Sequence, residues 1–194
     1  MAKNGLTLAK NLLLIGGSAG SLEVILQFLP FIQLGPDLAI VMVLHRKAGD
    51  DSPLVELLTF RTHTPVKEAE EKEPVNGGVI YVAPADYHLL VERNLTFSLD
   101  FSEKVNYSRP SIDLTFQTAA EAPFTKLTCL LLSGANEDGS AGVEAVKLAG
   151  GTFAVQDPST AEVFFMPQKA INRVKPDFLL KPKDMSDFIN SLNS

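Results

Sequence analysis

The sequence has little of what disulfide-bonded and membrane-spanning proteins require. Cys129 is the one cysteine in 194 residues, which excludes an internal disulfide and any cysteine-rich zinc module and fits a reducing cytoplasm. The longest apolar runs, such as Leu38–Leu44, fall far short of the roughly 18–20 residues that a membrane-spanning helix needs. We therefore expect a cytoplasmic location and no membrane insertion.

Positive charge and histidine are also scarce. The chain has 17 lysines and arginines against 23 aspartates and glutamates, a net charge of -6. Nucleic-acid binders normally show a basic face, so no nucleic-acid partner is expected. The three histidines (His45, His63 and His88) are scattered and no HExxH motif is present, so no metal site is expected.

Short apolar runs alternate with amphipathic stretches over most of the chain, which is typical of βαβ units around a mostly parallel sheet. With no linker and no internal repeat, residues 1–194 are predicted to form a single α/β domain whose mostly parallel, doubly wound sheet is flanked by helices. The predicted parallel strands are Asn11–Ile15, Leu38–Leu44, Lys126–Leu132, Thr152–Gln156 and Phe178–Leu180. The predicted helices are Ser21–Leu29, Leu54–Phe60 (starting from Asp51-Ser52-Pro53), Ser111–Glu121, Ser140–Leu148, Pro167–Arg173 and Asp184–Leu192.

The stretch around residues 75–101 has a different pattern. Val79–Ala83, His88–Glu92 and Leu95–Asp100 are short apolar segments separated by turn residues. They predict a short antiparallel β meander inserted into the α/β domain. The charged stretch Val66–Glu73 has no clear period and is predicted to be a solvated loop or an edge strand.

Three polar residues come just after predicted parallel strands: Ser18, His45 and Asp138. Ligands of open α/β sheets bind outside the carboxyl ends of the strands. A serine, a histidine and an aspartate that meet there can form an activated nucleophile, in which histidine takes the serine proton and aspartate orients the imidazole.

Each of these residues also has a structural interpretation. Gly16–Gly20 (GGSAG) matches G-x-S-x-G on a strand-to-helix turn, but such a turn can equally be a phosphate- or anion-binding loop. His45 could be an ordinary surface histidine, and Asp138 could be the N-cap of Ser140–Leu148. The order Ser, His, Asp along the chain excludes an α/β-hydrolase, which needs a late histidine.

Taken together, the segments resemble the catalytic domain of the chemotaxis protein-glutamate methylesterase (CheB-type) family. Ile15–Ser21 (IGGSAGS) is similar to the nucleophile segment of that family, and His45 in VLHR to its histidine. The other matching segments are Val79–Leu89 (VIYVAPADYHL), Arg109–Asp113 (RPSID), Leu132–Gly142 (LSGANEDGSAG) and Met166–Asn172 (MPQKAIN).

The resemblance implies a serine esterase that hydrolyses γ-glutamyl methyl esters on the cytoplasmic helices of chemoreceptors, with deamidation of receptor glutamines as a second reaction. It makes Ser18 the nucleophile, His45 the general base and then acid, and Asp138 the orienting carboxylate. It places the backbone N–H groups of Ala19 and Ala135 at the oxyanion hole. It implies no cofactor, and its protein partners are the methylated chemoreceptors.

The chain departs from the family pattern in four side chains around the site. Alanine replaces the usual threonine at Ala19 and a methionine at Ala135, while Ser21 and Asn136 replace glycines. A typical member also carries an N-terminal receiver domain, so a separate receiver-domain regulator is a possible partner of this chain. Two alternatives to the esterase remain: a partner-binding signalling domain of the same fold that is weakly active or inactive, and a nucleotide-binding domain that uses Gly16–Gly20.

Overall fold

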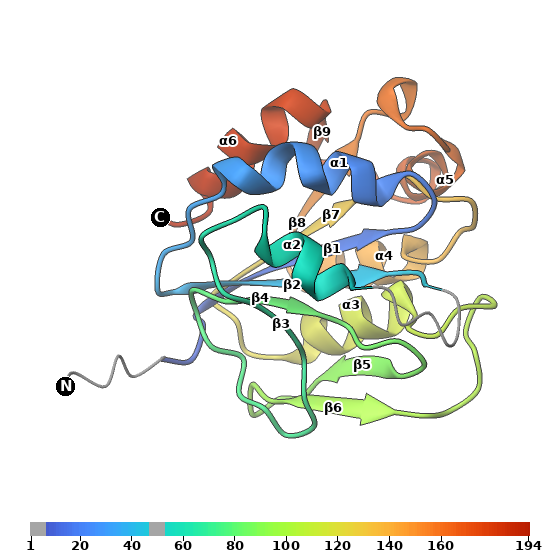
Figure 1. The fold of residues 1–194 in the computed structure, drawn as a ribbon. Coiled ribbons are helices and arrows are strands. Elements are labelled where there is room, and N and C mark those ends of the chain that lie inside the picture. The colour runs from blue at the N-terminus through green and yellow to red at the C-terminus, as the bar shows by residue number, and fades with distance from the viewer. Residues whose placement is uncertain (1–6, 47–52) are drawn as a thin grey trace.

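The computed structural model describes residues 7–46 and 53–194. Its centre is a parallel sheet of seven strands in the order β3-β4-β2-β1-β7-β8-β9 (Figure 1). These strands are β1 (Asn11–Gly17), β2 (Leu38–Leu44), β3 (Val66–Glu68), β4 (Ile80–Val82), β7 (Lys126–Leu131), β8 (Thr152–Gln156) and β9 (Phe178–Leu180). This confirms the predicted α/β class and the mostly parallel sheet.

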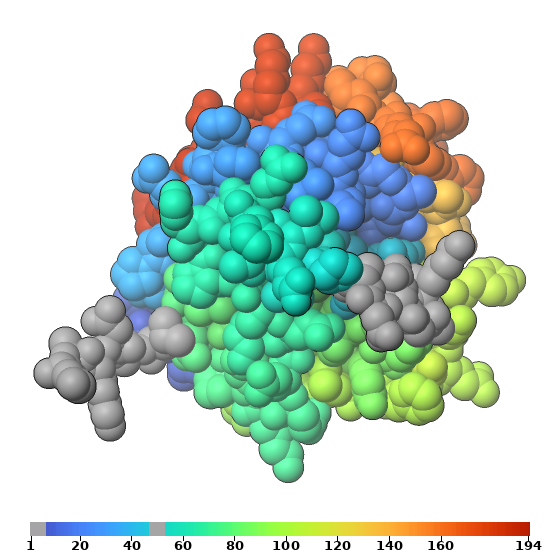
Figure 2. All heavy atoms as spheres, viewed as in Figure 1, coloured from blue at the N-terminus to red at the C-terminus, as the bar shows by residue number. Residues whose placement is uncertain are grey.

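Helices cover both faces of the sheet, as a doubly wound fold requires. The helices are α1 (Ser21–Phe28), α2 (Leu54–Thr59), α3 (Ile112–Glu121), α4 (Ser140–Leu148), α5 (Phe165–Arg173) and α6 (Met185–Ser191). Three short 3₁₀ segments lie at Leu29–Phe31, Pro158–Thr160 and Pro182–Asp184. Side chains of α1, α2 and α6 pack on one face, and those of α3, α4 and α5 pack on the other. Figure 2 shows α1 and α2 covering the sheet from their side.

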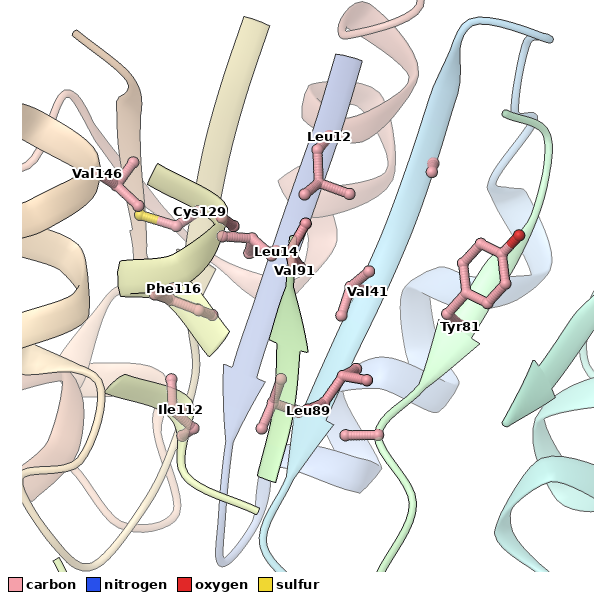
Figure 3. Close-up of a cluster of buried hydrophobic side chains, with 14 of the residues drawn as sticks. Leu12, Leu14, Val41, Tyr81, Leu89, Val91, Ile112, Phe116, Cys129 and Val146 are labelled. Carbon is pink, nitrogen blue, oxygen red and sulfur yellow. The ribbon is translucent and has the colours of Figure 1, made fainter. Parts of the chain in front are cut away.

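The central strand β1 is buried at every position, because it lies between two other parallel strands and under helices on both faces. Leu13 and Ile15 pack with α1 and α6, whereas Leu12 and Leu14 point into the opposite core. Figure 3 shows Leu12 and Leu14 in that second core, with Phe116 of α3 close by. The continuous apolar run that predicted this strand therefore reflects two separate cores.

The middle of the chain differs in part from the predicted meander. Only β5 (His88–Val91) and β6 (Phe97–Asp100) form a separate antiparallel pair, and this hairpin lies below α3 in Figure 1. Val79–Ala83 instead contains β4, which pairs in parallel with β2 and β3. The short apolar run could not reveal this, because periodicity alone does not show which sheet so short a strand joins. Val66–Glu73 contributes the short edge strand β3, one of the two alternatives predicted for it.

Most helix boundaries agree with the predicted ones within about two residues. Ser111 caps α3 as expected, with its Oγ accepting a hydrogen bond from the Leu114 N–H. The expected helix start at Asp51-Ser52 lies outside the described residues, and α2 is described from Leu54. Within residues 7–46 and 53–194, none of the helices combines the length and apolar character needed to cross a membrane.

Candidate active site

The predicted site residues follow three neighbouring strands of the sheet. Ser18 comes after β1 and His45 after β2, and the last paired residues of these strands, Gly17 and Leu44, lie side by side. The N–H of His45 donates to the Gly17 carbonyl at 3.1 Å, and the N–H of Ser18 donates to the Ser133 carbonyl, just beyond β7, at 2.9 Å. Ladder-like hydrogen bonds thus continue past the strands and hold the loops next to one another.

The turn between β1 and α1 is tight because two glycines permit it. Gly20 has a φ of 79°, a left-handed conformation that glycine adopts without steric cost. A Cβ on Gly17 would lie 2.4 Å from the Cβ of Ser21. The Ser21 Oγ in turn donates to the Ser18 carbonyl at 2.6 Å and locks the turn. Ser18 is therefore half-buried at the first position beyond the strand.

Asp138 does not cap α4, which was its alternative role. The N-cap of α4 is Gly139, and no side chain caps that helix. The Asp138 carboxylate instead lies at the N-terminus of α3, where it accepts hydrogen bonds from the N–H groups of Ile112 at 2.7 Å and Asp113 at 3.0 Å. The Ser111 Oγ donates to it at 3.1 Å. The start of this helix favours negative charge, so α3 holds a carboxylate that comes from another loop.

His45 and Asp138 form a buried hydrogen-bonded pair. The His45 Nε2 lies 2.7 Å from Asp138 Oδ2, and the two side chains are 11% and 0% exposed. Because the carboxylate accepts, we assign the imidazole proton to Nε2, which leaves Nδ1 as the free base. Burial would raise the pKa of Asp138, but the hydrogen bonds from His45, Asp113 and Ile112 outweigh it and hold that pKa below its ordinary value. Asp138 is thus kept ionised, which is what orients a general base.

The Nδ1 of His45 contacts a serine, but that serine is Ser108 rather than Ser18. The Ser108 Oγ lies 3.3 Å from His45 Nδ1, a long hydrogen bond. Residues Asn106 and Tyr107, with φ of 49° and 63°, form the turn that precedes Ser108. Among the hydrogen bonds of the described residues, none joins the Ser18 hydroxyl to His45. Catalytic hydrogen bonds are often loose without substrate, so this geometry leaves both hydroxyls as chemical candidates.

Two backbone N–H groups near Ser18 are free to bind an anion. In the described part of the chain, neither Ala19 nor Ala135 donates its N–H to a protein acceptor, and both residues are exposed. They belong to adjacent loops, after β1 and β7. The buried Ser133 joins these loops, because its Oγ donates to the Ala19 carbonyl at 2.7 Å and accepts from the Val163 N–H at 2.9 Å. Unpaired N–H groups fixed in this way are what an oxyanion hole requires.

A second aspartate, Asp113, lies directly beside Asp138. Its carboxylate accepts hydrogen bonds from the Gly142 N–H at 2.7 Å and from Asn106 Nδ2 at 2.9 Å. Burial is the main reason that its pKa is raised above the ordinary value; the Gly142 hydrogen bond opposes this, and the charge of Asp138 adds to it. Asp113 therefore ties α3 to α4, and its place in the first turn of α3 also complements the helix dipole.

Several residues that support the site were not predicted from the sequence. Ser133 joins the loops that carry Ser18 and Ala135, and Ser108 contacts the base. His88 is fully buried between the Ser111 N–H, at 3.1 Å from Nδ1, and the Glu103 carbonyl, at 2.8 Å from Nε2. Both ring nitrogens are thus occupied by neutral groups. Each of these residues lies within or next to a motif quoted above, which was the only signal in the sequence.

The described residues contain no group of three or more His, Cys, Asp or Glu side chains that could hold a metal ion. His63 is exposed in the loop between α2 and β3. His45 can act as a general base, and the hydroxyls of Ser18 and Ser108 lie near it. The N–H groups of Ala19 and Ala135 can bind an anion. Such an arrangement is suited to acyl transfer.

Comparison with known proteins agrees with this chemistry. A protein from Leptospira interrogans, provisionally named protein-glutamate methylesterase/protein-glutamine glutaminase, is 40% identical over 93% of this chain and 94% of its own length. A protein-glutamate methylesterase/protein-glutamine glutaminase of Natronomonas pharaonis is 37% identical over 92% of this chain, which spans about half (51%) of that relative.

The crystal structure of the Thermotoga maritima CheB methylesterase catalytic domain has the same fold. It superposes with a TM-score of 0.87 and 34% sequence identity, covering 93% of this chain and 97% of that one. The sequence itself matches the CheB methylesterase family over residues 13–189. On both sequence and structure, the chain belongs to the CheB methylesterase family.

Proposed function

We propose that the protein is a serine esterase that hydrolyses γ-glutamyl methyl esters on methylated chemoreceptors, releasing glutamate and methanol. The observation that carries the proposal is the buried Asp138–His45 pair at the carboxyl end of the sheet, next to the turn that bears Ser18. The names of the relatives support the substrate, since two curated proteins at 37–38% identity are called protein-glutamate methylesterases. Those names also include a glutaminase activity, so we extend the proposal to receptor glutamines.

In the proposed reaction, the Ser18 Oγ attacks the ester carbonyl carbon while its proton moves to Nδ1 of His45. The N–H groups of Ala19 and Ala135 stabilise the negative oxygen of the tetrahedral intermediate. The intermediate collapses, and the proton on His45 leaves with methanol. Water then attacks the acyl-enzyme and gives a proton to His45; that proton passes to the Ser18 Oγ as the second intermediate collapses, which releases the glutamate side chain and restores both residues. A glutamine substrate would release ammonia in place of methanol.

The proposal also covers the domain organisation, the place of the reaction and a regulator. We propose that residues 1–194 act as one catalytic domain, because the sheet from β1 to β9 is continuous. We propose the cytoplasm as the place of reaction, since the receptor helices that the family demethylates are cytoplasmic. A separate receiver-domain protein as regulator rests on the resemblance alone.

The four departures around the site are compatible with activity. Ala19 and Ala135 would contribute only their N–H groups, which any residue except proline supplies. Ser21 adds the hydrogen bond that locks the turn, and the side chain of Asn136 accepts from the Asp138 N–H at 3.1 Å. These contacts favour the esterase over an inactive partner-binding domain.

The test measures methanol release from receptor cytoplasmic fragments that have been methylated by their methyltransferase. Ser18→Ala should lower the rate by at least about 10³-fold, since it removes the nucleophile. Ser108→Ala is the matched control, because it removes the other hydroxyl near His45 and should lower the rate by less than about tenfold. A reversed pattern would make Ser108 the nucleophile, and no release by the folded wild-type protein would refute the esterase.

A fluorophosphonate provides the independent measurement, because it labels only an activated serine. Peptide mapping by mass spectrometry should find the label on Ser18 in the wild-type protein and in Ser108→Ala. Labelling on Ser108, or none at all, would contradict the proposal.

A further inference from the structure

A pocket of about 290 Å³ opens beside His45. Its lining residues are His45, Arg46, Asp86, Lys104, Tyr107, Ser108 and Arg109. Ser18 is not among them, so the pocket adjoins the candidate base without being the place of ester cleavage. Its volume is at the small end for ligand sites and suits one side chain rather than a cofactor.

The lining of this pocket is basic in a protein that is acidic. Among the lining residues that the structure describes, Arg46, Lys104 and Arg109 face one acidic residue, Asp86, whereas the whole chain has a net charge of -6. A cleft of one sign raises the local concentration of ligands of the opposite sign. The excess of positive charge beside His45 therefore favours an anion.

The two arginines are only partly satisfied by the protein. Arg46, whose side chain is 10% exposed, uses its Nη2 to donate to the Ala83 carbonyl at 2.8 Å and to Glu68 at 3.3 Å. Arg109 donates through Nη1 to the Ser102 carbonyl at 2.8 Å. The Nε atoms of both arginines are buried and have no hydrogen-bond partner among residues 7–46 and 53–194. Buried guanidinium groups that lack partners are costly, and an anion in the pocket would offset that cost through its charge.

The pocket is also held in shape by an aromatic contact. The Arg109 guanidinium lies 4.0 Å from the centre of the exposed Phe101 ring. This cation–π contact fixes the position of the guanidinium. The Nη2 of Arg109 has no protein partner in the described residues. Tyr107, 96% exposed, stands at the rim. A large exposed aromatic side chain next to a basic pocket is typical of a surface that binds another protein.

Building on the proposed esterase function, we propose that this pocket binds the carboxylate of an acidic residue that lies one helical turn from the esterified glutamate of the substrate. On a helix, residues three or four positions apart lie on the same face with Cβ atoms about 5–6 Å apart. A helix that presents its ester to Ser18 would bring such a neighbour past His45 and into the pocket. Arg46, Lys104 and Arg109 thus select substrate sites that carry an acidic neighbour.

The experiment compares helical peptides that each carry one γ-methyl glutamate. The neutral peptide has alanine at positions three and four on both sides of the ester, and each acidic peptide has glutamate at those positions on one side. The wild-type protein should hydrolyse one acidic peptide with a kcat/KM about tenfold above that of the neutral peptide. Equal rates for all the peptides would overturn the proposal.

Variants then assign the preference to the pocket. Lys104→Gln and Arg109→Gln should each bring the acidic-to-neutral ratio close to one, and Arg109→Lys should restore part of it. The matched control is Arg93→Gln, because Arg93 is 80% exposed, pairs with Glu121 and does not line this pocket. Arg93→Gln should leave the ratio unchanged; a fall equal to that of the pocket variants would mean that the overall charge, not the pocket, causes the preference.

A binding measurement separates this proposal from the esterase function itself. Fluorescence anisotropy of the same peptides with Ser18→Ala should show about tenfold tighter binding of the acidic peptide at low salt, lost at high salt. If the wild-type protein hydrolyses no ester but this preference persists, the esterase fails and the pocket stands. If all the peptides are hydrolysed and bound equally, the esterase stands and the pocket proposal fails.

Discussion

Asp138 combines two structural tasks in one side chain. Its Oδ2 accepts from His45 and from the Ile112 N–H, both at 2.7 Å, so the same oxygen orients the base and satisfies the start of α3. Its Oδ1 accepts from the Ser111 hydroxyl and the Asp113 N–H. At the scale of the residue, the orientation of His45 therefore depends on the position of a helix.

These hydrogen bonds predict how the stability contributed by Asp138 depends on pH. Because its pKa is lowered in the folded state, its contribution is complete above the unfolded value of about 3.9 and is lost as the pH falls through the folded value. Asp138→Asn should lower the free energy of unfolding by about 1–3 kcal/mol at pH 6. Urea unfolding should show the difference from wild type shrinking by about 1 kcal/mol at pH 3. A difference that stays constant would contradict the lowered pKa.

Asp113 provides a control, because its pKa is shifted in the opposite direction to that of Asp138. Its pKa is raised in the folded state, mainly by burial, so its ionised form destabilises the protein as the pH rises from about 4 towards that raised value. Relative to Asp113→Asn, the wild-type protein should therefore become more stable as the pH falls from 6 to 3. If both variants gave the same trend, the effect would come from the overall charge of the protein rather than from these two sites.

At the scale of the element, the turn between β1 and α1 sets the place of Ser18. Gly20, with φ of 79°, allows the chain to reverse within three residues of the strand. A Cβ at Gly20 would lie 2.7 Å from the Cβ of Glu162 and 2.9 Å from the Oγ of Ser133. The turn thus packs against the loops that follow β7 and β8, and it cannot change without moving them.

A matched pair of glycine variants tests this packing. Gly150 also has a positive φ, 84°, but a Cβ there would meet nothing within 4 Å. Gly150→Ala should cost about 1 kcal/mol of unfolding free energy and leave esterase activity unchanged. Gly20→Ala should cost more than that and reduce kcat/KM at least about tenfold, because the contact with Ser133 displaces the turn. Equal losses of activity in the two variants would show that the turn does not position the site.

At the scale of the whole molecule, two cores share one sheet. Leu13 and Leu14 are neighbours in β1 and both are 0% exposed, yet they belong to different cores. Alternate residues of a strand point to opposite faces, and helices cover each face here. Neither core could form without the sheet, so we expect the two to unfold together.

Substitutions on the two faces test that expectation. Leu13→Ala and Leu14→Ala should each lower the free energy of unfolding by about 2–5 kcal/mol, because each opens a cavity in a closed core. Leu148→Ala is the control, since Leu148 is 84% exposed and should change stability by less than about 0.5 kcal/mol. Urea unfolding followed by circular dichroism measures all three. A small cost at either β1 position would mean that its face is not fully covered.

The sequence alone predicted those elements whose local pattern is strong. The run at Leu38–Leu44 reads as a strand buried on both faces, and Ser111 precedes a helix that it does cap. Residues that directly follow strands, such as Ser18 and His45, could be placed at one edge of the sheet because parallel strands share their direction. The sequence thus determined the fold class and the edge of the sheet at which the candidate site residues lie.

Only the tertiary structure decided which groups meet. It joined Ile80–Val82 to the main sheet, and it placed Asp138 at the start of α3 instead of α4. It also brought Ser108 to His45 and Arg109 to the same pocket. These contacts join residues far apart in the chain, and their energies depend on burial and on the direction of hydrogen bonds. Burial and hydrogen-bond direction cannot be read from the sequence, because both arise only when separate elements pack together.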